Sequence, residues 1–366
     1  MKSVRNFFHL YNSLFNVIFL ILFLYLFLLS LELMGTSLKM FGKGLAEGLI
    51  KSTTNPFVGL FIGILATSII QSSSSTTTIV VGLVAGGALN IGNAIPIIMG
   101  ANIGTSVTNI LVSLTQINRS LEFQRSFSAA IVHDFFNLLA VLVLFPIQYF
   151  TNFLGRIATF LGQELQHIGG LKFLSPVKAL TKPAVVLLKN IIGEYPWVLL
   201  VLSLILLMLS LVLMVKSLKH LVVEKAEAWF DRYLFKNARW AFLVGIILTS
   251  MVQSSSITTS LVVPMAGAGL LTMAQLFPYT LGTNIGTTIT AILAALVTGN
   301  LSAIIVAFSH LMFNISGIVI WWPFKRVPIT LAQRFATFST KRKFIPVLYI
   351  IFVFFILPIT LIYFFK

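Results

Sequence analysis

The 366-residue chain is 58% hydrophobic and 9% charged, with a mean hydropathy of +1.00. Soluble domains carry about 25% charged residues, so this composition excludes a soluble globular protein and indicates a polytopic membrane protein. The net charge of +16 comes from basic residues at the ends of apolar segments, which is typical of membrane anchoring and gives no indication of nucleic-acid binding.

Apolar segments long enough to cross a bilayer recur along the whole chain, since a span needs about 20 such residues. The first has a longer apolar run than a signal peptide and lacks a small-residue cleavage site, so we expect it to be retained. Lys2 and Arg5 before it favour a cytoplasmic N-terminus. The predicted spans are Leu14–Met34, Ser126–Phe145, Trp197–Val215, Ala303–Trp322 and Phe344–Phe365, with longer apolar blocks at about 57–115 and 240–297.

The chain contains an internal duplication. The stretch "GILATSIIQSSSS" from Gly63 aligns without a gap to "GIILTSMVQSSSI" from Gly245, and the match continues through "GANIGT" and "GTNIGT". "HDFFN" from His133 then matches "HLMFN" from His310. The predicted division is an N-terminal span and interfacial segment (1–56), repeat 1 (57–150), a connector (151–194), repeat 2 (195–343) and a C-terminal span (344–366).

The two repeats are predicted to be inverted in the membrane. The connector after the repeat 1 motifs carries Arg119 and Arg125, whereas its counterpart in repeat 2, Thr298–Ser302, has no charge. This asymmetry favours opposite sides of the membrane for the two connectors. The segments before both repeats are basic, which weighs against inversion. An inverted pair of repeats is the plan of many secondary transporters.

A hydroxyl-rich motif lies within each uncharged apolar block. Serine runs are poor helix interiors, so we expect a helix break at Gln71–Ser74 and another at Gln253–Ser256. Each break creates a helix N-terminus whose free N–H groups attract anions, and the side chains add neutral donors. The two breaks are predicted to face each other across the repeat interface and to hold an anion.

A second motif, Gly100–Thr105 and Gly282–Thr287, follows each break. Its glycines permit close backbone approach and positive φ, so we expect unwound carbonyls that join Asn and Thr oxygens in binding a cation such as sodium. No Asp, Glu, Lys or Arg lies between Lys51 and Arg119 or between Arg239 and Lys325. Co-bound cations would therefore supply the countercharge for an anion.

Other polar residues favour structural roles. His133 and His310 each lie one helical turn before an asparagine, and we expect buried, hydrogen-bonded side chains. Asp134 is unmatched in the other repeat, where Leu311 stands, and is interpreted as a headgroup-level or local structural acid. Gly86–Gly87 and Gly267–Gly269 are predicted to form hairpin turns.

These motifs resemble the type II sodium-dependent phosphate cotransporter family, including its animal renal and intestinal members. The resemblance rests on the paired "QSSS", "GANIGTSVTN", "HDFFNLLAVLVL", "LGTNIGTTITAILAAL" and "FNISGIVIWWPF", and covers about residue 35 to the last span. It implies an all-α fold with two inverted repeats, each with a helical hairpin and a discontinuous transmembrane helix, and sodium-driven, elevator-like transport of phosphate.

By motif, the resemblance assigns two sets of site residues and no organic cofactor. The phosphate site would be lined by Gln71, Ser72, Ser73, Ser74, Gln253, Ser254, Ser255 and Ser256. The sodium candidates are Thr76, Thr77, Asn102, Thr105, Thr258, Thr259, Asn284 and Thr287.

The chain departs from the family in three places. The connector is short and has no cysteine, whereas animal members have a large external loop there. The first repeat block lacks the acidic residue of charge-moving members, which favours electroneutral transport. Some bacterial relatives append a soluble domain after the last span, whereas this chain ends at Lys366, so we expect a bacterial inner-membrane protein. A homodimer is compatible with the sequence.

Three other functions are compatible with parts of the sequence. Oxyanions such as sulfate or arsenate, or a dicarboxylate, would suit the same neutral donors, and only the resemblance selects phosphate. A passive anion channel would also use hydroxyl-lined breaks. An intramembrane serine hydrolase could use His133 and Asp134, but adjacent helical residues point about 100° apart and no Gly-x-Ser-x-Gly motif is present, so we do not expect an enzyme.

Overall fold

The structure, a computed structural model, describes residues 18–30, 32–33, 36–37, 40, 48, 50–53, 55–165, 176–193, 195–222, 235–298 and 300–365. Within these residues all regular structure is helical, which confirms the predicted all-α membrane fold. In chain order the helices are α2 (Pro56–Ile70), α3 (Ser73–Ala85), α4 (Ile91–Gly104), α5 (Ser106–Leu114), α6 (Ser120–Thr151), α7 (Phe153–Leu165), α8 (Pro176–Ile192), α9 (Pro196–Val222), α11 (Ala238–Val252), α12 (Ser255–Gly267), α13 (Met273–Thr298), α14 (Leu301–Trp321), α15 (Arg326–Lys341), α16 (Ile345–Ile351), the π-helical η2 (Phe352–Ile356) and α17 (Leu357–Phe365).

Long apolar helices occupy the predicted spans. Among the described residues, four stretches are long and apolar enough to cross a membrane: Ile91–Leu114, Ser120–Thr151, Leu301–Trp321 and Ile345–Phe365. Ser120–Thr151 contains the predicted span 126–145, and the last two stretches cover all but one residue of the predicted spans 303–322 and 344–365. Residues 18–30 of the predicted first span are helical. Part of the rest of that span lies outside the described residues, and so do Lys2 and Arg5.

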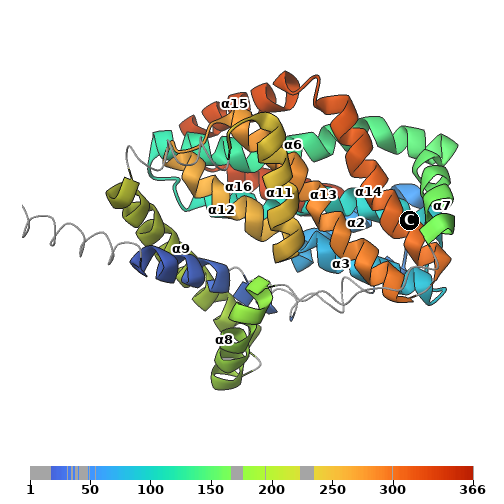
Figure 1. The fold of residues 1–366 in the computed structure, drawn as a ribbon, viewed down its shortest axis with the longest axis horizontal. Coiled ribbons are helices and arrows are strands. Elements are labelled where there is room, and N and C mark those ends of the chain that lie inside the picture. The colour runs from blue at the N-terminus through green and yellow to red at the C-terminus, as the bar shows by residue number, and fades with distance from the viewer. Residues whose placement is uncertain are drawn as a thin grey trace, which may run out of the picture.

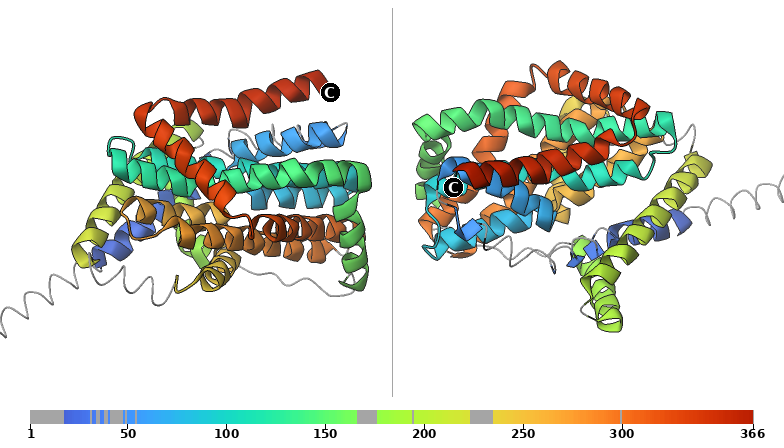
Figure 2. Two further views of the ribbon diagram at one scale, coloured as in Figure 1. Left: turned by 90° about the horizontal axis from the view of Figure 1, so that it is seen from above. Right: turned by 180° about the vertical axis from the view of Figure 1, so that it is seen from behind.

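The helices form one elongated bundle with a smaller group beside it. Helix α6 runs along most of the bundle, and α17 lies next to α2, where Asn55 Nδ2 donates to the Phe365 carbonyl at 3.1 Å (Figure 2). Residues 18–30, α8 and α9 lie at one side (Figure 1). This side group has its own small apolar core, made by Leu29, Leu33, Val185 and Leu199.

Each repeat packs partly against the other repeat. In each repeat the helix before the break packs on the helix that carries the Asn-Gly motif, α2 on α4 and α11 on α13. The helix after the break packs on its own repeat and also on the other one: α3 on α4 and on α13 and α14, and α12 on α13 and on α5 and α6. Each break is therefore placed at the boundary between the two repeats.

The predicted hairpin turns are confirmed. Gly87 joins α3 to α4 with φ +73°, and Gly269 joins α12 to α13 with φ +82°, a region that favours glycine. Both turns therefore use the glycines that the sequence repeats at these places.

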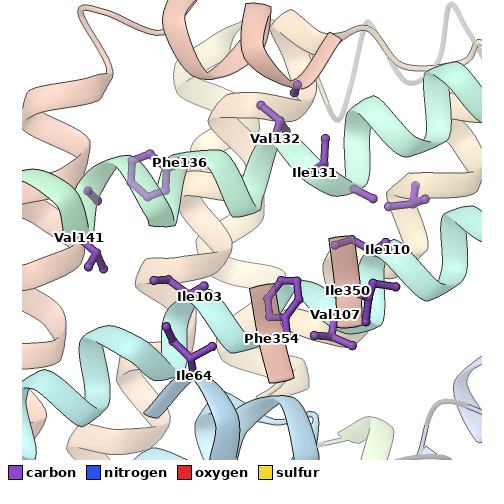
Figure 3. Packing of buried hydrophobic residues seen from close by; sticks show 14 of the residues in the cluster. Ile64, Ile103, Val107, Ile110, Ile131, Val132, Phe136, Val141, Ile350 and Phe354 are labelled. Carbon is purple, nitrogen blue, oxygen red and sulfur yellow. The ribbon is translucent and has the colours of Figure 1, made fainter. Parts of the chain in front are cut away.

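The main apolar core fills the space between α2, α4, α5, α6 and the C-terminal helices. Ile64, Ile103 and Val107 belong to this core together with Phe136 and Phe354 (Figure 3). The π-helical turn η2 places fully buried Phe354 in this core. Pro358 accounts for the wide turn, because it has no N–H to donate to the Phe354 carbonyl and its ring would clash with that carbonyl in a regular α-helix.

Candidate transport site

Both glutamine–serine motifs interrupt their helices, as predicted. Gln71 ends α2 with φ 56° and ψ 31°, and Gln253 ends α11 with φ 57° and ψ 31°. These are left-handed conformations, in which a residue other than glycine is uncommon. The next residue, Ser72 or Ser254, has an extended backbone conformation, and a new helix begins after it. The two breaks thus have the same backbone geometry.

Serine side chains cap the new helices. Ser72 Oγ accepts the Ser75 N–H at 3.2 Å, and Ser254 Oγ accepts the Ile257 N–H at 3.4 Å. The N–H groups of the first two residues of each helix, Ser73 and Ser74 or Ser255 and Ser256, have no acceptor within the helix. Ser73 and Ser255, at the first helical position, are buried, with 2% and 3% of their surface exposed. Each break therefore presents a sheltered helix N-terminus surrounded by hydroxyl groups.

A pair of threonines bridges each break. The Thr67 hydroxyl donates to the Thr76 hydroxyl at 3.0 Å, and Thr249 and Thr258 share the equivalent hydrogen bond at 2.8 Å. Thr67 and Thr249 were not predicted as site residues, although they recur at matching positions of the repeat. Because each bridge joins the helices before and after the break, it holds the opening in one shape.

Helix α5 connects the two breaks. Thr108 Oγ1 donates to Gln71 Oε1 at 3.3 Å, and the next residue, Asn109, accepts from the Thr259 and Ser260 hydroxyls at 2.8 and 3.0 Å. Thr108 thus bonds α5 to the first break, and Asn109 bonds α5 to the helix that follows the second break. Asn109 was missed by the sequence analysis, because position 291 of the other repeat is Ala and the comparison of repeats gave no signal there.

The Asn-Gly motif is not unwound, so this expectation was wrong. Helix α13 continues through Gly282–Thr287, and only Thr105 separates α4 from α5, with φ −61° and ψ −30°. The glycines serve close packing instead. A side chain at Gly100 would collide with the Leu60 carbonyl, and one at Gly282 with the Phe242 carbonyl. The backbone of this motif is therefore helical throughout in repeat 2 and interrupted at a single residue in repeat 1.

Asn102 is held by the opposite repeat. Its Nδ2 donates to Asn314 Oδ1 at 2.7 Å, and its Oδ1 is 2.9 Å from His310 Nε2. Since this oxygen is the acceptor, His310 donates from Nε2. Asn137 Nδ2 also donates to the Asn102 carbonyl at 2.8 Å. Both of these side-chain hydrogen bonds of Asn102 are thus made with repeat 2, whereas Asn137 of its own repeat bonds to its backbone.

Asn284 makes the matching contacts with the repeats exchanged. Its Oδ1 lies 2.6 Å from His133 Nε2, and its Nδ2 donates to Asn137 Oδ1 at 2.9 Å. Asn314 Nδ2 donates to the Asn284 carbonyl at 3.4 Å. His133 and His310 are buried and hydrogen-bonded, as predicted. The six side chains form one network across the repeat interface.

Asp134 lies away from this network. It is fully buried, and the Tyr349 hydroxyl on α16 donates to its Oδ2. The headgroup-level interpretation was therefore wrong, while that of a local structural acid agrees with the contact. His133 and Asp134 bond to different helices, so they do not form the His–Asp pair of a hydrolase.

The sodium candidates fall into three groups. Asn102 and Asn284 belong to the network. Most of the threonine hydroxyls bond to a backbone carbonyl of the preceding turn, which leaves lone pairs on the oxygen; these are Thr76, Thr105, Thr258, Thr259 and Thr287. Thr77 Oγ1 is buried and, within the described part of the chain, has no partner. The roles of all eight residues in binding sodium remain predictions.

Comparison with known proteins decides the family. The family model for the Na+/Pi-cotransporter matches residues 26–172 and 206–357, and so covers both repeats. The chain belongs to this family. This family membership confirms the resemblance inferred from the sequence motifs.

Curated relatives in this family are similar along most of the chain. Sodium-dependent phosphate transport protein 2B of Homo sapiens is 33% identical, and protein 2A of Ovis aries is also 33% identical, each over 90% of this chain. The match covers 62% and 64% of those proteins, so the chain spans less than two thirds of their length. No solved structure matches.

Proposed function

We propose that the protein is a sodium-coupled transporter of inorganic phosphate that works by elevator-like alternating access with two inverted repeats. The observation that carries the proposal is the pair of helix breaks with equal geometry at the repeat boundary. Free N–H groups and serine hydroxyls at a helix N-terminus suit an oxyanion. The names of the family and of the curated relatives support sodium and phosphate as the transported ions.

Sodium supplies the positive charge that the site lacks. A dianion near the middle of a bilayer is costly without countercharge, and both repeat blocks are free of lysine and arginine from residue 52 to 118 and from 240 to 324. In this proposal the threonine oxygens around each break hold sodium, while the serines and glutamines of the motifs hold phosphate. A site of neutral donors also releases its anion when sodium leaves.

Uptake into vesicles tests the proposal. The purified chain is reconstituted into liposomes, and entry of radiolabelled phosphate is followed under an inward sodium gradient. We expect saturable uptake that stops when potassium replaces sodium. A passive channel would conduct without sodium, and phosphate uptake unaffected by the cation would refute coupling.

Two additions to this experiment settle the remaining points. Competition by unlabelled sulfate, arsenate and succinate identifies the anion, because hydroxyl and amide donors suit oxyanions in general. Uptake at several imposed membrane voltages measures the charge moved, for which the uncharged first repeat block leads us to propose electroneutral transport. We also propose the inner membrane of a bacterium as its location, which separation of the inner and outer membranes of the native cells tests.

A further inference from the structure

The two hairpin turns are held by different groups of the opposite repeat. Asn300 Nδ2 donates to the Ala85 carbonyl, 3.2 Å away, at the turn between α3 and α4. At the turn between α12 and α13 the neighbour is Arg125, whose guanidinium occupies the space where a side chain at Gly269 would lie. One turn is therefore held by a neutral amide, and the other lies against a positive charge.

The charge of Arg125 has no hydrogen-bond or ion-pair partner within the described residues. Arg119, at the start of the same helix, differs in this respect, because its Nη1 lies 3.0 Å from Glu122 Oε2. An unpartnered guanidinium keeps its donors available in a planar fork that matches phosphate oxygens. Arg119 therefore serves as an internal comparison for Arg125.

Arg125 faces a cavity of about 390 Å³ between α6, α15 and the α12–α13 turn. Neutral polar side chains share its lining, and no acidic residue does; the polar members are Gln124, Ser128, Thr272 and Gln333. A cavity that combines one free cation with neutral donors suits an anion, and its lining has no negative charge that would repel one.

We propose that this cavity binds a phosphate group, either of free phosphate or of an anionic lipid. The phosphate-specific role rests on the proposed function. Helix α12 has 13 residues and is about 20 Å long, so the cavity lies that far from Ser254 along the hairpin. It is therefore a separate site from the one at the break. Because the α3–α4 turn has Asn300 in place of a cation, the site serves only one of the two hairpins.

Binding can be measured without transport, because the chain contains no cysteine. Leu121 lines the cavity and is 61% exposed, so Leu121→Cys introduces a single reactive thiol there. The rate of its reaction with a neutral maleimide is measured with rising inorganic phosphate, at constant ionic strength against chloride. We expect phosphate to slow the reaction severalfold. The protection should disappear with Arg125→Gln and persist with Arg119→Gln.

A second arm replaces free phosphate with phosphatidylglycerol in detergent micelles. Protection by the lipid alone identifies a headgroup as the ligand. Protection by neither, or protection that survives Arg125→Gln in a variant with an unchanged melting temperature, overturns the proposal. If Arg125→Gln does not fold, the Leu121→Cys chain by itself still decides whether phosphate protects.

Transport gives a separate readout. If free phosphate is the ligand, Arg125→Gln should raise the phosphate KM about tenfold, as expected for the loss of a hydrogen bond to a charged group, with little change in kcat. An unchanged KM overturns the assignment to free phosphate. Failure of sodium-driven uptake in the unmodified chain would refute the proposed function and leave the labelling result standing.

Discussion

His310 of repeat 2 holds Asn102 of repeat 1 through a contact of 2.9 Å, and His133 of repeat 1 holds Asn284 of repeat 2 at 2.6 Å. The two pairs are equivalent under exchange of the repeats. Each histidine thus orients the asparagine of the Asn-Gly motif in the opposite repeat, on α4 or α13. This reciprocal arrangement couples the repeats through buried hydrogen bonds, which are costly to leave unmade.

The first prediction concerns this coupling. His133→Ala should destabilise the protein by about 1–3 kcal/mol, because it leaves the Asn284 amide oxygen buried without its donor. Asn284→Ala should have a similar effect, and the double variant should cost less than the sum of the two. Thermal unfolding in detergent measures all three. Additive effects would show that the contact contributes nothing, and Thr337→Ala, at an exposed hydrogen bond, is the control.

The second prediction separates the backbone of the first break from its amide. Gln71→Gly favours the observed positive φ, so folding and membrane insertion should be retained. Loss of the amide should weaken apparent phosphate affinity by about tenfold, the value of one hydrogen bond to a charged ligand. Gln71→Val should lower the unfolding free energy by about 1–3 kcal/mol, because a β-branched residue is strained there. Unchanged phosphate affinity in Gln71→Gly would remove Gln71 from the site.

The third prediction concerns the serines at the first helical position. Ser73→Ala and Ser255→Ala should each abolish most sodium-driven phosphate uptake, while the protein still reaches the membrane. Ser309→Ala is the matched control, since this buried hydroxyl only donates to the Ile305 carbonyl of its own helix. Uptake at the wild-type rate in either site variant contradicts the assignment of the phosphate site.

The fourth prediction compares two glycines of repeat 1. Gly100→Ala should destabilise the protein severely, because its Cβ would overlap the Leu60 carbonyl and push α4 away from α2. Gly82→Ala meets no atom within 4 Å and should stabilise α3 by about 0.5–1 kcal/mol. Melting temperatures of the two variants in one detergent test both signs. Equal shifts would contradict the close packing of α2 and α4.

The fifth prediction concerns Thr77. Its equivalent in repeat 2, Thr259, bonds to Asn109 and to the Ser255 carbonyl, and Ala291 stands at the position that corresponds to Asn109. Within the described part of the chain the Thr77 hydroxyl has no partner. Thr77→Val should therefore leave the melting temperature nearly unchanged and raise the sodium concentration for half-maximal uptake. Unaltered sodium dependence would exclude Thr77 from the sodium site.

Local features were the most predictable part of the molecule. The breaks at Gln71 and Gln253, the hairpin turns and the long spans all depend on intrinsic preferences of serine, glycine and apolar residues within a few positions. The Asn-Gly motif was misread for a related reason. Glycine permits an unwound backbone, but it also permits close contact between helices. Only the position of α2 beside α4 shows that close contact is the role of glycine here.

Contacts between the repeats were beyond prediction from spacing. Asn109 has no counterpart in repeat 2, and Tyr349 lies 215 residues from Asp134 in the chain. Neither residue carries a local signal that names its partner. The pairing of each histidine with an asparagine of the other repeat likewise depends on how the repeats pack.

The sequence by itself determined the membrane character of this protein, its duplication and the places where its helices end, because apolarity, repetition and capping act over short stretches of chain. The tertiary structure decided that each helix after a break also packs on the opposite repeat, and which side chains close the network between the repeats. Those outcomes depend on fitting whole helices together so that buried polar groups find partners, and that requirement is met only in three dimensions.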